Sequence, residues 1–132
     1  MCGIVAYKGH KNCYPILLNG LKRLEYRGYD SAGIACINSN DKLVVTKRKG
    51  KVSELKSALS NSEIYNLGIA HTRWATHGKP NQLNAHPHLD QSKKIALVHN
   101  GIIENYDPIK KFLLSKNIKF RSETDTEVLV QL

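Results

Sequence analysis

The residue whose type and place most directly suggest chemistry is Cys2, one position from the start of the chain. Removal of Met1 would make Cys2 the N-terminal residue and put a thiol and a free α-amine on one residue. An α-amine titrates near about 7.7–8.0 and a thiol near about 8.5, so this amine can take up the thiol proton close to neutral pH. The arrangement predicts a nucleophile that carries its own general base. Taken alone, a cysteine at position 2 is more often a bystander, so other residues must support the prediction.

Six motifs follow one another along the chain. They are residues 2–5 (CGIV), 23–33 (RLEYRGYDSAG), 71–78 (HTRWATHG), 84–88 (NAHPH), 99–105 (HNGIIEN) and 122–127 (SETDTE). The series closely resembles the glutaminase domain of glutamine:fructose-6-phosphate amidotransferases (glucosamine-6-phosphate synthases), which are class II glutamine amidotransferases. The resemblance runs through all 132 residues. Relatives that make phosphoribosylamine typically read His-Arg-Gly-Gln where this chain has Tyr26-Arg27-Gly28-Tyr29.

The resemblance implies both a fold and a reaction. The fold is α+β, a four-layer αββα sandwich of the N-terminal-nucleophile hydrolase type, with two antiparallel sheets between helices. The reaction is hydrolysis of the side-chain amide of glutamine, which in a full-length synthase supplies ammonia for conversion of fructose 6-phosphate to glucosamine 6-phosphate. Sugar binding, isomerisation and amine transfer belong to a C-terminal region of such synthases that residues 1–132 do not include. We therefore expect the N-terminal part of a glutaminase domain, able at most to hydrolyse glutamine.

Four residues are expected to join Cys2 at the reacting centre. Attack on an amide creates a tetrahedral oxyanion, and one hydrogen-bond donor fixed at that charge is worth about 3–4 kcal/mol. Asn100 can offer its side-chain amide and Gly101 its backbone N–H, with no side chain in the way. Without the resemblance, Asn-Gly is more often only a hairpin turn. By resemblance, Arg27 and Gly28 pack beside the nucleophile and hold its surroundings.

Free glutamine must be held by its α-carboxylate and its α-ammonium group. Arg73 is the natural fork for the carboxylate and Asp125 the natural partner of the ammonium, and the resemblance assigns these tasks to the same positions. Taken alone, Asp125 is an acid favoured in the first turn of a helix, and both descriptions can hold. Trp74, Thr76 and His77 follow in a segment that such enzymes use as a mobile lid, which sheds water and limits ammonia loss. A small satellite core around the tryptophan is the alternative.

Composition limits the other classes of function. The net charge is +9, and six basic residues crowd positions 42–56. Such runs usually form solvated faces, and the sequence offers no recognition helix or aromatic stacking platform, so we expect no nucleic-acid partner. The apolar stretches fall far short of the ~20 residues of a membrane helix, and the front of the chain lacks a secretory signal. We expect a soluble, cytoplasmic protein with no membrane partner.

The histidines and cysteines do not predict a cofactor. The histidine spacings do not match the short pairs of zinc sites, and the three cysteines are expected to be free thiols. We therefore expect no metal and no cofactor. Glutamine is the expected small-molecule partner, and fructose 6-phosphate is expected to bind only through the C-terminal region. A homo-oligomer is possible. The alternative function is a non-catalytic fragment that binds glutamine or another subunit, which exposed apolar surface would favour.

Hydrophobic spacing and capping signals predict the elements that carry these residues. Strands are predicted over 4–7, 32–37, 43–47, 68–72 and 95–99, the second and third joined as a hairpin. Helices are predicted after Asn12, near Ser53 as a cap, at Asp107-Pro108 with a buried face of Ile109, Phe112 and Leu113, and after Thr124, where Glu127 completes a capping box. Residues 73–94 are predicted to form a functional loop. The last helix lacks a stop signal, so we expect the domain to continue beyond residue 132.

Overall fold

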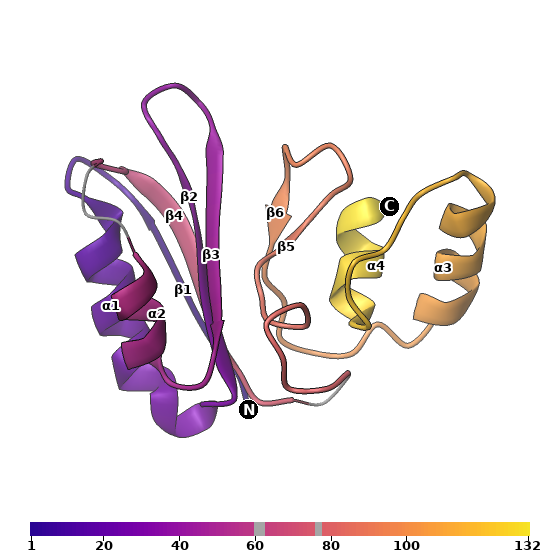
Figure 1. The fold of residues 1–132 in the computed structure, drawn as a ribbon, viewed down its shortest axis with the longest axis horizontal. Helices are drawn as coiled ribbons and strands as arrows, with labels where there is room; N and C mark the ends of the chain where they lie inside the picture. The colour runs from indigo at the N-terminus through magenta and orange to yellow at the C-terminus, as the bar shows by residue number, and fades with distance from the viewer. Residues whose placement is uncertain (60–62, 76–77) are drawn as a thin grey trace.

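The computed structural model describes residues 1–59, 63–75 and 78–132, and its elements form four layers (Figure 1). Helices α1 (Cys13–Leu24) and α2 (Val52–Ala58) cover one face of an antiparallel sheet. That sheet has the strand order β1-β4-β2-β3, from β1 (Gly3–Lys8), β2 (Ser31–Ile37), β3 (Leu43–Lys49) and β4 (Leu67–Arg73). A two-stranded sheet of β5 (His88–Leu89) and β6 (Ala96–Leu97) follows, then α4 (Asp125–Gln131) and α3 (Tyr106–Ser115).

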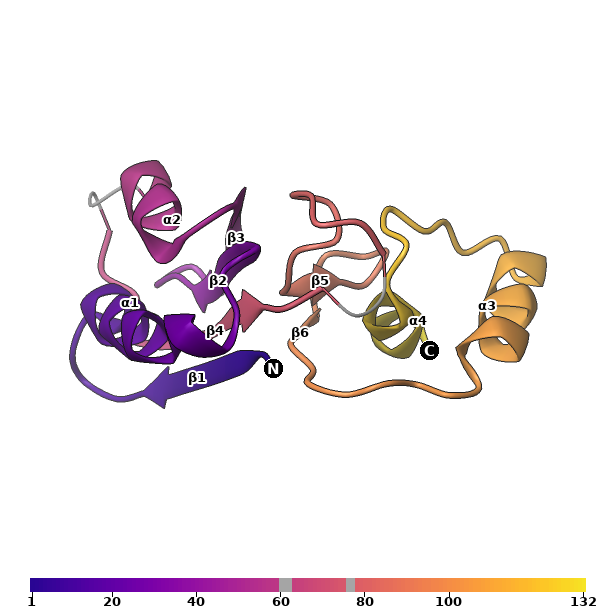
Figure 2. The same ribbon diagram turned by 90° about the horizontal axis from the view of Figure 1, so that it is seen from below.

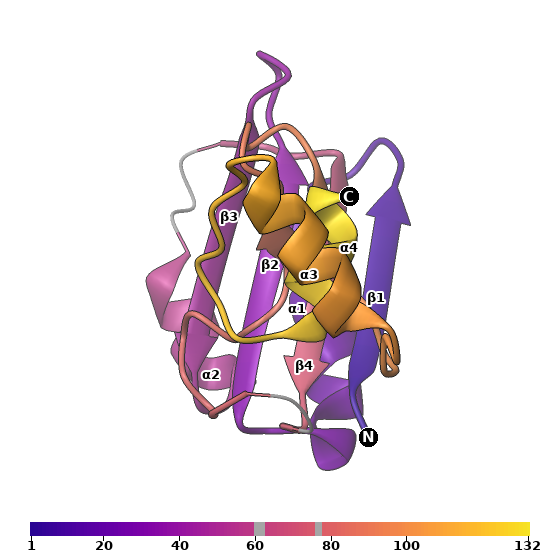
Figure 3. The same ribbon diagram turned by 90° about the vertical axis from the view of Figure 1, so that its right-hand side faces the viewer.

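The order helix, sheet, sheet, helix confirms the predicted αββα sandwich. Figure 2 shows the same succession from below, with the N-terminus at the junction of the two halves. Figure 3 looks onto the outer helical layer, with α3 in front of α4. Within the described part of the chain, no helix is long and apolar enough to cross a membrane.

The apolar core lies between the first sheet and its two helices. The Asn12 side chain accepts a hydrogen bond from the Tyr14 N–H and caps α1, as predicted. Leu17 and Leu21 are fully buried one helical turn apart, where they meet Leu55 of α2. Full burial of such a side chain contributes about 1.5–3 kcal/mol. This core fixes the four-stranded sheet that carries the start of the chain.

The cap of α2 differs from the prediction. The helix begins after Lys51, and Ser53 does not cap it. Instead the Val52 N–H donates to Glu25 Oε2 at 2.8 Å, and Glu25 belongs to the short 3-10 helix η1 (Glu25–Arg27) that follows α1. A carboxylate from a distant part of the sequence satisfies the helix end, so local spacing could not identify it.

The second half departs from the prediction in four respects. The loop predicted over 73–94 contains β5, and the strand predicted over 95–99 is only the two residues of β6. Helix α3 begins after Asn105, so Asp107 lies in its first turn and pairs with Lys111 at 2.8 Å instead of capping the helix. Leu113 is buried as predicted, but Phe112 is 55% exposed, because α3 forms the outermost layer and packs mainly against α4.

The junction between the two sheets is built of buried polar side chains. His71 of β4 and His86 stack with ring centroids 4.1 Å apart, and His88 meets His86 edge-on at 4.7 Å. Gly33 of β2 permits this approach, because a Cβ there would lie 2.0 Å from the His86 carbonyl oxygen. Burial lowers the pKa of His71 to about 4 and that of His88 to about 3, and it lowers the pKa of His86 as well. The three imidazoles are therefore neutral at pH 7.

We expect these histidines to make the fold sensitive to mild acid. In the unfolded chain their pKa returns to about 6.5, so between pH 6.5 and about 4 the unfolded state binds more protons than the folded state and stability falls as pH falls. Each histidine contributes up to about 1.4 kcal/mol per pH unit. The free energy of unfolding, measured with urea between pH 7 and 5, should fall as pH falls, and His88→Gln should reduce the slope of this free energy against pH by about this amount. His10→Gln, at an exposed position, should leave the slope unchanged; equal slopes for wild type and His88→Gln would contradict the expectation.

Candidate active site

A pocket of about 370 Å³ opens where the start of β1, the end of β4, the segment after β6 and the start of α4 meet. It draws together residues from opposite ends of the chain. The predicted site residues that line it are Cys2, Arg27, Arg73, Trp74, Asn100, Gly101 and Asp125. Gly28 lies directly behind the pocket wall, and Thr76 and His77 lie outside the described residues.

Cys2 is held on two sides. It precedes β1, which pairs antiparallel with β4, so that Gly3 lies opposite Thr72. The backbone N–H of Trp74 donates to Cys2 Sγ at 3.2 Å, and the Asn100 side-chain Nδ2 donates to the Cys2 carbonyl oxygen at 3.0 Å. The thiol is half-buried, with Met1 exposed beside it in the pocket lining. These two contacts hold Cys2 between the end of β4 and the segment after β6.

Gly28 has a steric role in this arrangement. A Cβ at position 28 would lie 2.7–2.9 Å from the Arg73 carbonyl group and the Trp74 nitrogen, so only glycine lets the turn after η1 come this close to β4. Its neighbour Arg27 directs Nη2 toward Met1 Sδ at 3.7 Å. Both predicted residues therefore lie against the surroundings of Cys2.

Asn100 and Gly101 do not form a hairpin turn. Strand β6 ends at Leu97, and the chain continues through residues 102–105 into α3, so the hairpin alternative is wrong. Gly101 has φ +148°, in the region that favours glycine. Asn100 is anchored by its Oδ1, which lies 2.8 Å from His71 Nε2. The Asn-Gly pair is thus a corner held against β4.

The charged residues predicted to hold the substrate line the same pocket and are 97% buried. Arg73 donates through Nη1 and Nη2 to the carbonyl oxygens of Lys79 and Gly78, at 3.1 and 3.3 Å. Asp125 accepts a hydrogen bond from the Ile103 N–H at 2.6 Å. It is the first residue of α4, and this hydrogen bond orients its carboxylate in the pocket.

The predicted capping box of α4 is only half formed. The Thr124 side chain accepts from the Glu127 N–H, as predicted. The Glu127 carboxylate does not return to Thr124 but accepts from the backbone N–H groups of Arg121 and Ser122, at 2.8 and 2.6 Å. The carboxylate therefore secures the turn before α4, which is the turn that delivers Asp125 to the pocket.

Asn84 is a positioning residue that sequence reasoning did not identify. It is 1% exposed; its Nδ2 donates to the Lys79 carbonyl at 2.9 Å, and its Oδ1 accepts from the Glu123 N–H at 2.8 Å. It thereby joins the loop that holds Arg73 to the turn that precedes Asp125. The only sequence signal for Asn84 was its place in the motif over 84–88, and that motif does not indicate which residues Asn84 contacts.

Asp30 anchors the start of the segment that follows β4. Its Oδ2 accepts a hydrogen bond from the Ala75 N–H, and its own N–H donates to the Arg73 carbonyl at 3.1 Å. Trp74 lies between these two contacts, with its ring edge-on to Tyr29 at 5.8 Å. Asp30 therefore fixes the backbone that donates to Cys2.

No cation site accompanies this pocket in the part of the chain that the structure covers. There, no three His, Cys, Asp or Glu side chains are grouped so as to hold a metal ion. The stacked imidazoles contact one another through ring faces and edges, whereas metal ligation needs ring nitrogens converging on one point.

The layer order and the pocket at the start of the first strand define a fold of the N-terminal-nucleophile type. Two solved structures share it over 100% of this chain and 29% of their own. One is glutamine phosphoribosylpyrophosphate amidotransferase from B. subtilis complexed with ADP and GMP, with 30% identity and a TM-score of 0.83. The other is the allosteric regulatory enzyme of purine biosynthesis, with 31% identity and a TM-score of 0.84.

Residues 56–132 match the family model described as a glutamine amidotransferase domain, and the chain belongs to this family. Among curated proteins it is 62% identical to the isomerizing glutamine–fructose-6-phosphate aminotransferase of Bacteroides thetaiotaomicron. It is 57% identical to the protein of the same name from Aquifex aeolicus. All of this chain is covered in both comparisons, but it spans only 22% of each relative.

The three thiols should be distinguishable by their reactivity. Cys13 and Cys36 are fully buried with their sulfurs 3.1 Å apart, and burial raises the pKa of both thiols. Cys2 faces the pocket. Titration with a chromogenic disulfide reagent should therefore count one thiol in the native chain and all three in urea, with Cys2→Ala reducing the native count to none. Native labelling of Cys13 or Cys36, located by mass spectrometry, would contradict the buried pair.

Proposed function

We propose that this chain hydrolyses the side-chain amide of glutamine, with Cys2 as the nucleophile and its own α-amine, freed by removal of Met1, as the general base. The observation that carries the proposal is the meeting of Cys2 with Asn100 and Gly101 in one pocket. Membership of the glutamine amidotransferase domain family supports the same chemistry.

The proposed reaction uses the pocket residues in sequence. The α-amine of Cys2 takes the thiol proton as Sγ attacks the amide carbon, and the oxyanion is stabilised by Asn100 Nδ2 and the Gly101 N–H. The proton then passes to the leaving nitrogen, the C–N bond breaks, and ammonia departs from a thioester. Water, deprotonated by the same amine, attacks the thioester carbon and releases glutamate and the thiol. The Trp74 N–H, 3.2 Å from Sγ, holds the sulfur in place before attack.

Substrate binding is assigned to the charged residues of the pocket. Arg73 is proposed to receive the α-carboxylate and Asp125 the α-ammonium group, and the carbonyls that hold the Arg73 guanidinium fix its plane. Arg27 and Gly28 are proposed to keep the surroundings of Cys2 in place. Trp74, with Thr76 and His77, is proposed to cover the bound glutamine and to limit loss of ammonia.

The wider role follows from the names of the longer relatives. We propose that residues 1–132 are the N-terminal part of a glutaminase domain and that, in a longer chain, the ammonia converts fructose 6-phosphate to glucosamine 6-phosphate. Fructose 6-phosphate would be bound by a C-terminal region, since the pocket residues of this chain are proposed to bind glutamine. A cytoplasmic location and a homo-oligomeric assembly belong to the same proposal.

Ammonia release from glutamine tests the nucleophile. The chain with Met1 removed, verified by intact mass, should release ammonia; Cys2→Ala and a chain prepared with Met1 still attached should both be inactive. Cys13→Ala serves as the matched cysteine control and should keep its activity per folded molecule. Activity that survives both changes at the N-terminus would disprove the nucleophile. Glutamine binding without ammonia release in the trimmed chain would instead favour a non-catalytic glutamine-binding fragment.

Asp125→Asn tests the ammonium site without removing the local hydrogen bond. Asparagine retains an oxygen that can accept from the Ile103 N–H but lacks the charge. A hydrogen bond to a charged group is worth about 1.5–3 kcal/mol, so KM for glutamine should rise about 10- to 100-fold while kcat changes little. Asp107→Asn, at an exposed position on α3, is the matched control. An unchanged KM in Asp125→Asn would remove Asp125 from the binding site.

A further inference from the structure

The two ends of the Asn100 side chain face different neighbours. One end lies 3.0 Å from the Cys2 carbonyl oxygen, and the other lies 2.8 Å from His71 Nε2. A carbonyl oxygen can only accept a hydrogen bond, so the end near Cys2 must be the amide nitrogen. The end near His71 is then the amide oxygen, which can only accept, so His71 Nε2 must carry a proton.

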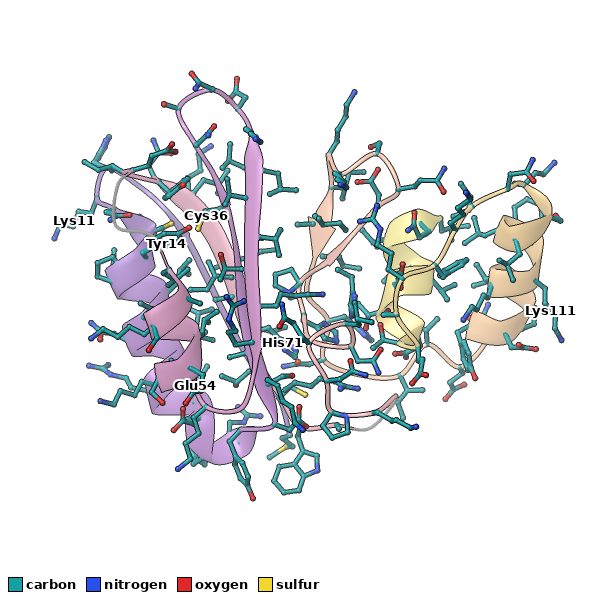
Figure 4. The ribbon with its side chains drawn as sticks, in the orientation of Figure 1. Lys11, Tyr14, Cys36, Glu54, His71 and Lys111 are labelled. Atoms are coloured by element: carbon teal, nitrogen blue, oxygen red, sulfur yellow. The ribbon has the colours of Figure 1, made fainter. Side chains whose placement is uncertain are left out.

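His71 is more deeply buried than Asn100, the residue it contacts. It is fully buried in β4, where it pairs with Ile4 of β1 on one side and Gly33 of β2 on the other. Its ring stacks on His86 with an interplanar angle of 13°, and His86 Nδ1 in turn accepts from the His99 N–H at 3.4 Å. Figure 4 shows His71 at the junction of the two halves. The Nε2–H direction is thus set by the sheet.

We propose that His71 is a positioning residue for the oxyanion-binding group: its Nε2–H holds Asn100 Oδ1 and so turns Asn100 Nδ2 toward Cys2. The inference rests on the proposed glutamine hydrolysis. His71 does not line the pocket, so it acts through Asn100 and does not touch the substrate.

Loss of this contact affects the transition state more than substrate binding. Without His71, only the contact of Nδ2 with the Cys2 carbonyl oxygen orients the amide of Asn100. The less firmly held amide can turn by 180° and present oxygen, which repels an oxyanion instead of stabilising it. In other enzymes, removal of one oxyanion donor lowers kcat about 10²- to 10³-fold. A donor that points away from the oxyanion for part of the time lowers kcat by less. The α-carboxylate and α-ammonium contacts through Arg73 and Asp125 remain, so KM should hardly move.

The first test is the tautomer of His71, read from the ¹⁵N shifts of its ring by NMR on the folded chain. Protonation at Nε2 is expected, together with a single, sharp pair of side-chain amide signals for Asn100 that broadens or shifts in His71→Leu. Protonation at Nδ1 alone would overturn the proposal, because Asn100 would then have to face His71 with its nitrogen. This measurement does not require activity.

The second test is kinetic, with two substitutions at one position. His71→Leu removes the donor and should lower kcat at least about tenfold with KM within about threefold. His71→Gln carries an amide nitrogen near the place of Nε2 and should recover most of the loss. His88→Leu removes another buried histidine of the same junction, one that meets His86 edge-on and makes no contact with Asn100. It should leave kcat of the folded chain within about threefold of wild type.

The outcomes separate the two proposals. An unchanged kcat in His71→Leu, or no recovery in His71→Gln, would overturn the role of His71 while leaving glutamine hydrolysis intact. If the wild-type chain with Met1 removed releases no ammonia, glutamine hydrolysis by this chain fails, and the ring shifts still decide whether His71 orients Asn100.

Discussion

The contact between Asn100 and Cys2 joins the two halves of the molecule at the place where the chemistry is expected. Cys2 belongs to the first sheet and Asn100 to the segment after β6. One such hydrogen bond contributes only about 0.5–1.5 kcal/mol, too little to hold two layers together. The buried junction behind it, with the stack of His71 and His86, keeps the halves in place. The pocket therefore depends on the docking of the layers more than on any single residue that lines it.

Elements whose determinants are local could be predicted from the sequence. Asn12 caps α1 two residues away, and Thr124 caps α4 three residues away, distances over which the chain itself fixes the geometry. The hairpin of β2 and β3 follows from two short apolar runs joined by a short polar connection. Most of the candidate site was predicted as well, because motif order carries information about a family fold that propensity alone does not contain.

Features that depend on contacts across the sequence could not be predicted. Glu25 caps α2 from 27 residues away, and no local pattern distinguishes it from a surface acid. Asn100-Gly101 has the composition of a hairpin turn, and only the absence of a following strand before α3 decides otherwise. Phe112 has the spacing of a buried residue yet is 55% exposed, because burial depends on what a helix faces. The orientation of the Asn100 amide likewise depends on His71.

The bridge made by Asn84 separates two tasks within one pocket. By tying the Lys79 carbonyl to the Glu123 N–H, it sets the distance between the guanidinium of Arg73 and the carboxylate of Asp125, and it does so without touching Cys2. Under the proposed function, the buried Asn84 spaces the two groups that bind the α-carboxylate and the α-ammonium of glutamine, while the exposed Asn100 faces the reacting amide. Recognition of the amino-acid end and chemistry at the amide thus depend on two different asparagines with separate sets of contacts.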